Sequence, residues 1–106
     1  MKHEEYGASI VNNLSDWDYV IGWRLPTVLR FGTFRVVIYP NDHRPAHVHV
    51  MGRGHEAVFK LNCPTGPIVL RENYGFSRTD TSRVKRVLLQ HLAHLCSEWG
   101  RIHGAA

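Results

Sequence analysis

The stretch that decides the fold reads Phe34-Arg-Val-Val-Ile-Tyr-Pro-Asn-Asp-His-Arg-Pro-Ala-His-Val-His-Val-Met51. Residues 34–39 have high β-propensity, and residues 46–51 alternate strictly, as in a strand with one buried face. The segment between them contains Pro, Asn and Asp, each of which favours a turn. We therefore predict two antiparallel strands, over residues 34–39 and 46–51, joined by a turn.

The sheet should continue beyond these two strands. Turn signals at residues 52–54 and 64–67 predict a third strand over residues 56–62 and a short fourth strand over residues 68–71. From Ser77 onward the apolar period becomes that of a helix. Its stripe comprises Val84, Val87, Leu88, Leu92, Leu95, Trp99 and Ile102. The predicted fold is α+β: a three- to four-stranded antiparallel meander, packed on one face by one long C-terminal helix.

Size and composition restrict the classes to which the protein can belong. Its 106 residues provide for one compact core, and a hydrophobic content of 43% argues against disorder. No apolar run is long enough to span a bilayer, so no membrane partner is expected. Because the chain shows no export signal, we expect a cytoplasmic protein in which Cys63 and Cys96 are reduced, buried thiols.

Charge divides the chain into an acidic N-terminal leader over residues 1–25 and a single basic domain over residues 26–106. The leader's two basic and four acidic residues sum to −2, and the domain's eleven basic and five acidic residues sum to +6. Part of the leader is expected to be helical, because its apolar residues recur at helical spacing. These residues are Ile10, Leu14, Trp17 and Ile21. The basic domain indicates an anionic partner, either nucleic acid or an acidic protein, or else serves solubility alone.

A cluster of histidines is the strongest candidate for chemistry. His47 and His49 alternate with apolar residues, so both imidazoles should lie on the wet face of the sheet, opposite the helix. His43 and Asp42 in the preceding turn can fold over that face. Three interpretations remain open: acid–base catalysis by His43, His47 and His49, a zinc site at these histidines with Asp42 as an alternative ligand, and a purely structural role. Acid–base catalysis is preferred, so no cofactor is expected and zinc is the alternative.

Basic residues around this face are candidates for binding phosphate groups. Lys60 or Arg53 is placed to stabilise the negative charge that develops on a phosphorane. Arg30 flanks the first strand, and Arg78 lies at the start of the predicted helix, where it contacts either a phosphate or solvent. Together with Asp42, these four residues are the predicted binding residues.

At the histidine cluster the sequence resembles a family of short bacterial proteins classed as a domain of unknown function. The family pattern Pro-Thr-x-x-Arg-Phe is matched by Pro26-Thr-Val-Leu-Arg-Phe31, and the pattern Asn-Asp-His-x-Pro-x-His-x-His-Val by Asn41-Asp-His-Arg-Pro-Ala-His-Val-His-Val50. A Glu56-Ala57 strand and a long C-terminal helix complete the resemblance, which runs from about Pro26 to the end. Family members often occur beside a second small protein, which implies a toxin–antitoxin module.

We therefore expect the toxin component of such a module, with a small antitoxin-like protein encoded next to it as partner. The expected activity is that of an RNA-cleaving or RNA-binding protein, a metal-independent endoribonuclease acting through the histidine-rich strand. The alternative is a non-enzymatic module that binds its partner protein or nucleic acid. A pocket lined by histidines would favour the enzyme, and a flat face with solvated imidazoles would favour the binding module.

Overall fold

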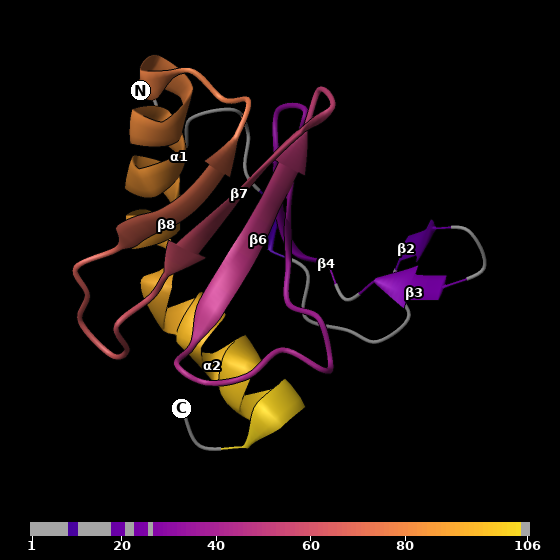
Figure 1. Cartoon of the computed structure of the whole chain (residues 1–106). Coiled ribbons are helices and arrows are strands. Elements are labelled where there is room, and N and C mark those ends of the chain that lie inside the picture. The colour runs from indigo at the N-terminus through magenta and orange to yellow at the C-terminus, as the bar shows by residue number, and fades with distance from the viewer. Residues whose placement is uncertain (1–8, 11–17, 21–22, 26, 105–106) are drawn as a thin grey trace.

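The computed structural model describes residues 9–10, 18–20, 23–25 and 27–104. A six-stranded antiparallel sheet of order β1-β4-β5-β6-β7-β8 forms its centre, and a two-stranded hairpin, β2-β3, projects from one side (Figure 1). The strands are β1 Ser9–Ile10, β2 Asp18–Val20, β3 Trp23–Leu25, β4 Thr27–Phe31, β5 Phe34–Val37, β6 His47–Gly52, β7 His55–Lys60 and β8 Val69–Tyr74. Two helices, α1 (Arg78–Gln90) and α2 (Leu92–His103), follow the last strand.

The sheet buries the face that the alternation of β6 predicts. Val48 and Val50 of β6 are fully buried, and Val50 pairs in register with Val36 of β5, which is also fully buried. Leu88 of α1 and Leu95 of α2 belong to the same hydrophobic core as these valines. Both helices therefore cover one face of the sheet (Figure 1), as the apolar stripe predicts.

The sheet has more strands than the three to four predicted. β4 precedes β5 in a hairpin whose turn contains Gly32 with a φ of 55°, and β1 pairs with the other edge of β4. Four of the five residues of β4 are buried and only Arg30 is half-buried. A strand buried on both faces lacks the two-residue alternation by which a half-exposed strand is recognised, which is why β4 escapes prediction.

Where the structure describes the leader, the chain is extended and not helical. β1 pairs with β4, and β2 pairs with β3. Within the span of the predicted helical stripe, residues 10 and 18–20 are therefore in strands and not in a helix. The predicted stripe residues Leu14, Trp17 and Ile21 lie outside the described residues.

The C-terminal helix predicted as one element is two helices. α1 begins after Ser77, whose Oγ accepts the N–H of Asp80 at 3.0 Å. It ends at His91, whose φ of −117° lies outside the helical range, and α2 starts at the next residue. The apolar stripe continues through both helices, so its period contains no sign of the break. Among the described residues, no helix is long and apolar enough to cross a membrane.

Cys63 and Cys96 form a disulfide, so the prediction of reduced thiols is wrong. Cys63 lies in the loop between β7 and β8, whereas Cys96 lies in α2, 33 residues later in the chain. Their Cα atoms are 5.8 Å apart because α2 packs across the end of the sheet where this loop lies. The spacing of the two cysteines along the sequence does not indicate that they approach each other in the fold. The cytoplasmic location expected from the sequence stays a prediction.

Leu88 and Leu89 are neighbours on α1 that test how this helix packs on the sheet. Leu88 is fully buried, whereas Leu89 is 53% exposed. The substitution Leu88→Ala should lower the free energy of unfolding by about 2–5 kcal/mol, because it leaves a cavity in the core. Leu89→Ala should change it by less than about 0.5 kcal/mol. Urea unfolding followed by circular dichroism measures both, and equal losses would contradict the placement of α1.

Candidate functional site

Strand β6 carries two histidines on the face opposite its core valines, here named the histidine face. His47 and His49 are two residues apart, so they project from the same side, and their ring centroids are 5.3 Å apart. Neighbouring strands supply the surroundings in register. Lys60 of β7 lies opposite His47, while Val37 of β5 and Val58 of β7 flank His49.

The turn between β5 and β6 brings Asp42 to the two imidazoles. The backbone N–H of Asp42 donates to the carbonyl of Tyr39 at 3.1 Å, and the backbone N–H of Tyr39 donates to Oδ2 of Asp42 at 3.0 Å. These bonds orient the carboxylate so that Oδ1 lies 3.2 Å from Nε2 of His49 and 3.6 Å from Nε2 of His47. One carboxylate oxygen therefore faces both rings, and we name these three residues the Asp42–His47–His49 cluster.

The other nitrogen of each ring is held by a hydrogen-bond acceptor. Nδ1 of His47 lies 2.8 Å from the carbonyl oxygen of Pro45, and Nδ1 of His49 lies 3.1 Å from Oε2 of Glu56. Carbonyl and carboxylate oxygens only accept hydrogen bonds, so Nδ1 carries a proton on both rings. Both imidazoles thus donate from Nδ1 and direct Nε2 at Asp42.

Two carboxylates control the protonation of His49. Burial disfavours the charged ring, but the hydrogen bonds and negative charges of Asp42 and Glu56 outweigh burial and raise the pKa of His49 above its ordinary value of 6.5. Burial also opposes ionisation of Asp42, yet the hydrogen bond and charge of His49, together with the N–H of Tyr39, lower the pKa of Asp42. Burial, followed by the charges of Glu56 and Asp42, raises the pKa of the Tyr39 phenol. With protons alone, the cluster favours an imidazolium at His49.

The histidine face is not the open, wet surface that the sequence predicts. His47 is 4% exposed, and its ring centroid lies 5.3 Å from that of Trp99 near the end of α2. Trp99 in turn stacks on His103, whose Nε2 lies 3.0 Å from the carbonyl oxygen of Tyr39. The two histidines lie side by side as predicted. The prediction that both imidazoles are wet and lie away from the helix is wrong for His47, because the end of α2 reaches past the start of β6 (Figure 1).

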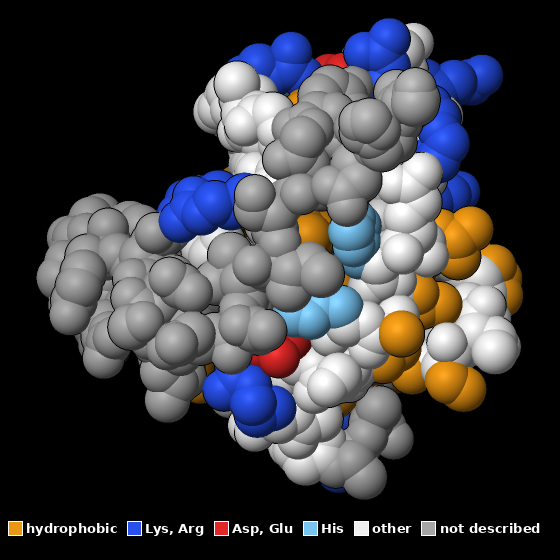
Figure 2. Space-filling view, turned by 180° about the vertical axis from the view of Figure 1, so that it is seen from behind, with side chains coloured by type: hydrophobic (Ala, Val, Ile, Leu, Met, Phe, Trp, Pro, Cys, Tyr) orange, Lys and Arg blue, Asp and Glu red, His pale blue; other side chains and the backbone are white. Residues whose placement is uncertain are grey.

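The other predicted residues lie outside the cluster. His43 is exposed in the β5–β6 turn and is not among the donor atoms that converge there, although its neighbour Asp42 is. Arg53 lies in the β6–β7 turn and forms an ion pair with Asp80 at 2.6 Å. Arg78 is exposed at the start of α1, and Figure 2 shows Lys and Arg side chains gathered along one edge of the molecule. Since α1 covers the core face of the sheet, Arg78 lies on the opposite side of the sheet from the Asp42–His47–His49 cluster.

Basic side chains also occupy the histidine face itself. Arg30 of β4 pairs in register with Arg35 of β5, and Arg35 pairs with Met51, which shares a face with His49. Lys60 lies opposite the first histidine of β6. Because residues paired across strands share a face, two arginines lie beyond one end of the cluster and a lysine lies at the other.

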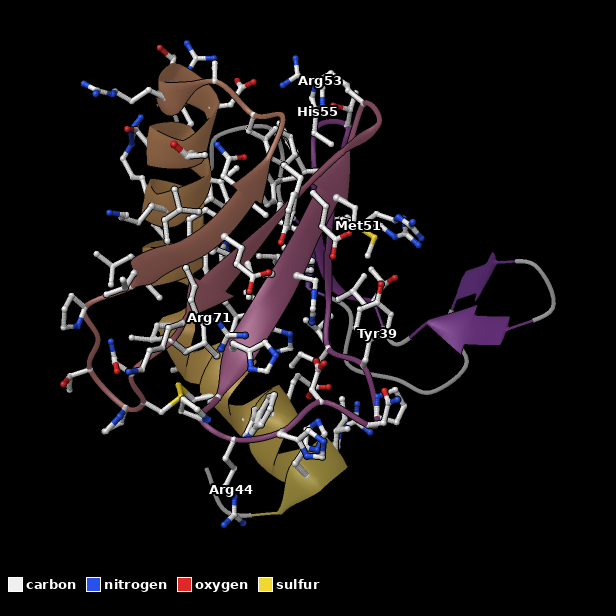
Figure 3. The ribbon with its side chains drawn as sticks, viewed as in Figure 1. Tyr39, Arg44, Met51, Arg53, His55 and Arg71 are labelled. Carbon is white, nitrogen blue, oxygen red and sulfur yellow. A yellow bond between two sulfur atoms is a disulfide. The ribbon has the colours of Figure 1, made fainter. Side chains whose placement is uncertain are left out.

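A cavity of about 450 Å³ adjoins the cluster. It is lined by Thr33, Arg35, Met51, Gly52, Arg53, Gly54, His55 and Glu56. Glu56 forms part of its wall and also holds Nδ1 of His49, so cavity and cluster share this carboxylate. In Figure 3, Arg53 and His55 lie at the β6–β7 turn, Met51 lies below them, and Tyr39 lies toward the other end of the sheet.

Neither Glu56 nor Tyr39 is among the site residues predicted from the sequence. The register of β6 with β7 places Glu56 opposite Met51, diagonally adjacent to His49 on the same face. Counting outward from the two-residue turn at Arg53-Gly54 yields this register, so that turn is the signal that could have identified Glu56. Tyr39 packs edge-on against His49, with 4.6 Å between the ring centroids.

The cluster has the donor set of a metal site. The ligand atoms of Asp42, His47 and His49 all lie within 4.8 Å of one another. Imidazole nitrogens and a carboxylate oxygen are ligands for zinc and other first-row transition metals. Of the two third ligands considered from the sequence, His43 and Asp42, the geometry places Asp42 with the two histidines of β6.

Comparison with known proteins gives a family match. A family model described as "Domain of unknown function (DUF4160)" matches residues 33–100. No curated protein and no solved structure matches the chain. The matched segment runs from the β4–β5 turn into α2 and contains the whole Asp42–His47–His49 cluster.

The contact between Glu56 and His49 predicts a measurable pKa change in protein freed of metal. Protonation of His49 favours the folded state, because its folded pKa lies above the ordinary value of 6.5. This contribution to stability is complete below the ordinary pKa and is lost as pH rises through the folded pKa. Glu56→Gln removes one of the two carboxylates that raise the pKa, so it should lower the pKa of His49 and move this loss of stability to lower pH.

Titration of the His49 ring by NMR measures the change. Glu72→Gln is the matched control, because Glu72 lies on the neighbouring strand β8 opposite Val58 but is hydrogen-bonded by Tyr74 and not by His49. Replacing Glu72 should leave the pKa of His49 unchanged. Equal effects of the two substitutions would mean that general surface charge, and not the Glu56 hydrogen bond, controls the ring.

Proposed function

Because this chain belongs to the family Domain of unknown function (DUF4160), whose activity its description leaves open, we propose a function from the site: the protein acts on RNA at the Asp42–His47–His49 cluster. We further propose that it is the toxic component of a two-gene module, with a small antitoxin-like protein as partner. One observation carries the RNA proposal. A half-buried cluster of two imidazoles and a carboxylate lies on one face of the sheet between basic side chains.

The charges on the histidine face suit a phosphodiester backbone. Arg30 and Arg35 lie beyond one end of the cluster and Lys60 lies at the other, so a strand of RNA crossing β6 meets positive charge on both sides. The cavity beside Glu56 is large enough for part of a nucleotide. Phosphate contacts of this kind position an RNA strand so that the phosphodiester bond to be cleaved lies at the Asp42–His47–His49 cluster.

The two imidazoles do not have equal access to a substrate. His47 is buried against Trp99, whereas the side chain of His49 is 15% exposed. A metal-independent cleavage by two imidazoles needs both rings at the substrate, one as base and one as acid. The burial of His47 therefore argues against this expected mechanism. RNA meets the cluster from the side of His49, Asp42 and the cavity.

A non-enzymatic module that binds its partner protein is the second candidate, and a different observation favours it. β8 is the outer strand of the sheet, and five of its six residues are exposed. An exposed edge strand can pair with a strand from another chain. This candidate places the function at β8 and leaves the histidine face without chemistry, so substitutions in the cluster separate the two proposals.

Cleavage of RNA should depend on His49. In the full chain, His49→Ala should lower the rate of single-stranded RNA cleavage by about 100-fold or more, because it removes a central group of the reactive cluster. His43→Ala is the matched control, since His43 lies in the adjoining turn but outside the cluster, and it should retain activity. Gel analysis of labelled RNA measures the rate, and growth of cells expressing each variant measures toxicity. A His49→Ala protein that still cleaves and remains toxic would contradict the proposal.

Binding of RNA should depend on salt and on the basic side chains of the histidine face. Lys60→Ala should weaken binding to single-stranded RNA and reduce the slope of log affinity against log salt by about 0.7, because one phosphate contact is lost. Lys85→Ala on α1 should change neither, since this helix lies on the core side of the sheet. Fluorescence anisotropy at several salt concentrations measures both slopes. Equal effects of the two substitutions would show that RNA does not select the histidine face.

A further inference from the structure

We infer that Asp42, His47 and His49 form a binding site for one divalent transition-metal ion, with Nε2 of both imidazoles and Oδ1 of Asp42 as its ligands. Glu56 and the carbonyl oxygen of Pro45 orient the two rings from behind. The site deepens the proposed function: the role of the ion in RNA cleavage rests on that function, whereas the binding of the ion stands on the geometry alone.

Among the described residues, the partners that the structure gives to the ring nitrogens of His47 and His49 are all hydrogen-bond acceptors. The carbonyl of Pro45 keeps a proton on Nδ1 of His47, so the neutral ring presents the lone pair of Nε2 to Oδ1 of Asp42, 3.6 Å away. His49 presents its own Nε2 to the same oxygen at 3.2 Å while Glu56 holds its Nδ1. In the metal-free protein, a proton on Nε2 of His49 joins that ring to Oδ1 of Asp42 by a hydrogen bond, but that proton does not reach Nε2 of His47. A single metal ion meets all three.

The charge of the two carboxylates that contact the rings also suits a divalent cation. With two neutral imidazoles, the cluster and Glu56 carry two negative charges, those of the carboxylates of Asp42 and Glu56. Two imidazolium ions would balance them, but one of these would be His47, which is 4% exposed and packed against Trp99. A divalent ion balances the same charge while both rings remain neutral, as histidine ligands are.

Two of the three distances between the ligand atoms are those found around one ion. Atoms bound at about 2.0–2.2 Å in tetrahedral geometry lie about 3.3–3.6 Å from one another. The separations from Oδ1 of Asp42 to the two Nε2 atoms are 3.2 and 3.6 Å. The three ligand atoms together lie within 4.8 Å of one another, so the two imidazole nitrogens would have to approach by at most about 1.2–1.5 Å to reach the tetrahedral spacing.

The hydrogen bonds behind the rings are those found at metal sites. A metal-bound histidine usually donates its second ring N–H to a carboxylate or to a backbone carbonyl, which holds the ring in place and strengthens the ligand. His49 donates to the carboxylate of Glu56, and His47 donates to the carbonyl of Pro45. Both types of partner are present, one behind each imidazole.

The donor set selects the class of ion. Two imidazoles and one carboxylate suit zinc, iron, cobalt or nickel, whereas calcium and magnesium prefer oxygen ligands only. Three protein ligands leave a position for water or for a phosphate oxygen, as in catalytic sites. The side chains of His49 and Asp42 are 15% and 12% exposed, which gives this position access to solvent. An ion bound there supplies a Lewis acid and an activated water.

Metal binding to the full chain, prepared with a tag that contains no histidine, tests the inference. After treatment with a chelator and its removal, the protein should bind one equivalent of Zn²⁺ or Co²⁺ by calorimetry, and Co²⁺ should produce visible absorption bands. Bound metal should also raise the melting temperature, since it binds the folded state. His49→Ala should lower the affinity by at least about 100-fold, and Glu56→Gln by about 10- to 100-fold because it removes an orienting partner.

His43→Ala is the control, because His43 lies in the same segment but outside the ligand set. It should bind metal like the unaltered protein, and circular dichroism of each metal-free variant separates lost binding from lost folding. Asp42→Asn serves as a second ligand variant, since an amide oxygen can still accept the N–H of Tyr39. The inference is overturned if the unaltered protein binds no equivalent of either ion, or if His43→Ala loses as much affinity as His49→Ala.

Failure of this inference is distinguishable from failure of the proposed function. RNA cleavage that depends on His49 but persists unchanged in excess chelator would overturn the role of the ion in cleavage and leave the RNA function, whereas failure of the unaltered protein to bind an equivalent of either ion would overturn the metal site itself. One equivalent of tightly bound metal, lost in His49→Ala, would uphold the metal site even if the protein leaves every RNA intact.

Discussion

The burial of two valines on β6 is the constraint on which the rest of the structure depends. Val48 and Val50 are fully buried in the core that the helices cover. Because successive residues of a strand point to opposite faces, this burial forces His47 and His49 together onto the other face. A register shift of one residue would turn the valines outward and the imidazoles into the core, at a large cost in free energy. The hydrophobic core thus determines that the two imidazoles are neighbours.

The end of α2 connects this core to the candidate site. Trp99, which is fully buried, packs against His47, and His103 stacks on Trp99 while it contacts the carbonyl of Tyr39. The backbone of Tyr39 also exchanges hydrogen bonds with Asp42: its carbonyl accepts the backbone N–H of Asp42, and its N–H donates to Oδ2 of the Asp42 side chain. The position of the carboxylate therefore depends on the docking of the helix as well as on the turn, and the disulfide in α2 restrains that helix against the β7–β8 loop.

Protonation and the proposed metal binding would be linked at this site, because both supply positive charge to the same acceptor atoms. Asp42 and Glu56 raise the pKa of His49 through hydrogen bonds and charge, although burial opposes this. The feature that favours a proton at Nε2 equally favours a cation in its place. Arg35 and Lys60 on the same face then extend the positive region toward any anionic strand that approaches.

Local pattern in the sequence was enough to predict the α+β class, the antiparallel β5–β7 strands, the start of α1 after Ser77 and the shared face of the two β6 histidines. Each of these follows from a periodicity or a cap that nearby residues define by themselves. Only the tertiary structure decided that β4 joins the sheet, that the C-terminal helix is interrupted at His91 and that Cys63 forms a disulfide with Cys96. It also decided that Asp42 and Glu56, and not His43, complete the histidine cluster. These outcomes depend on which residues from different strands, turns and helices approach one another, and the period of a single segment does not contain that information.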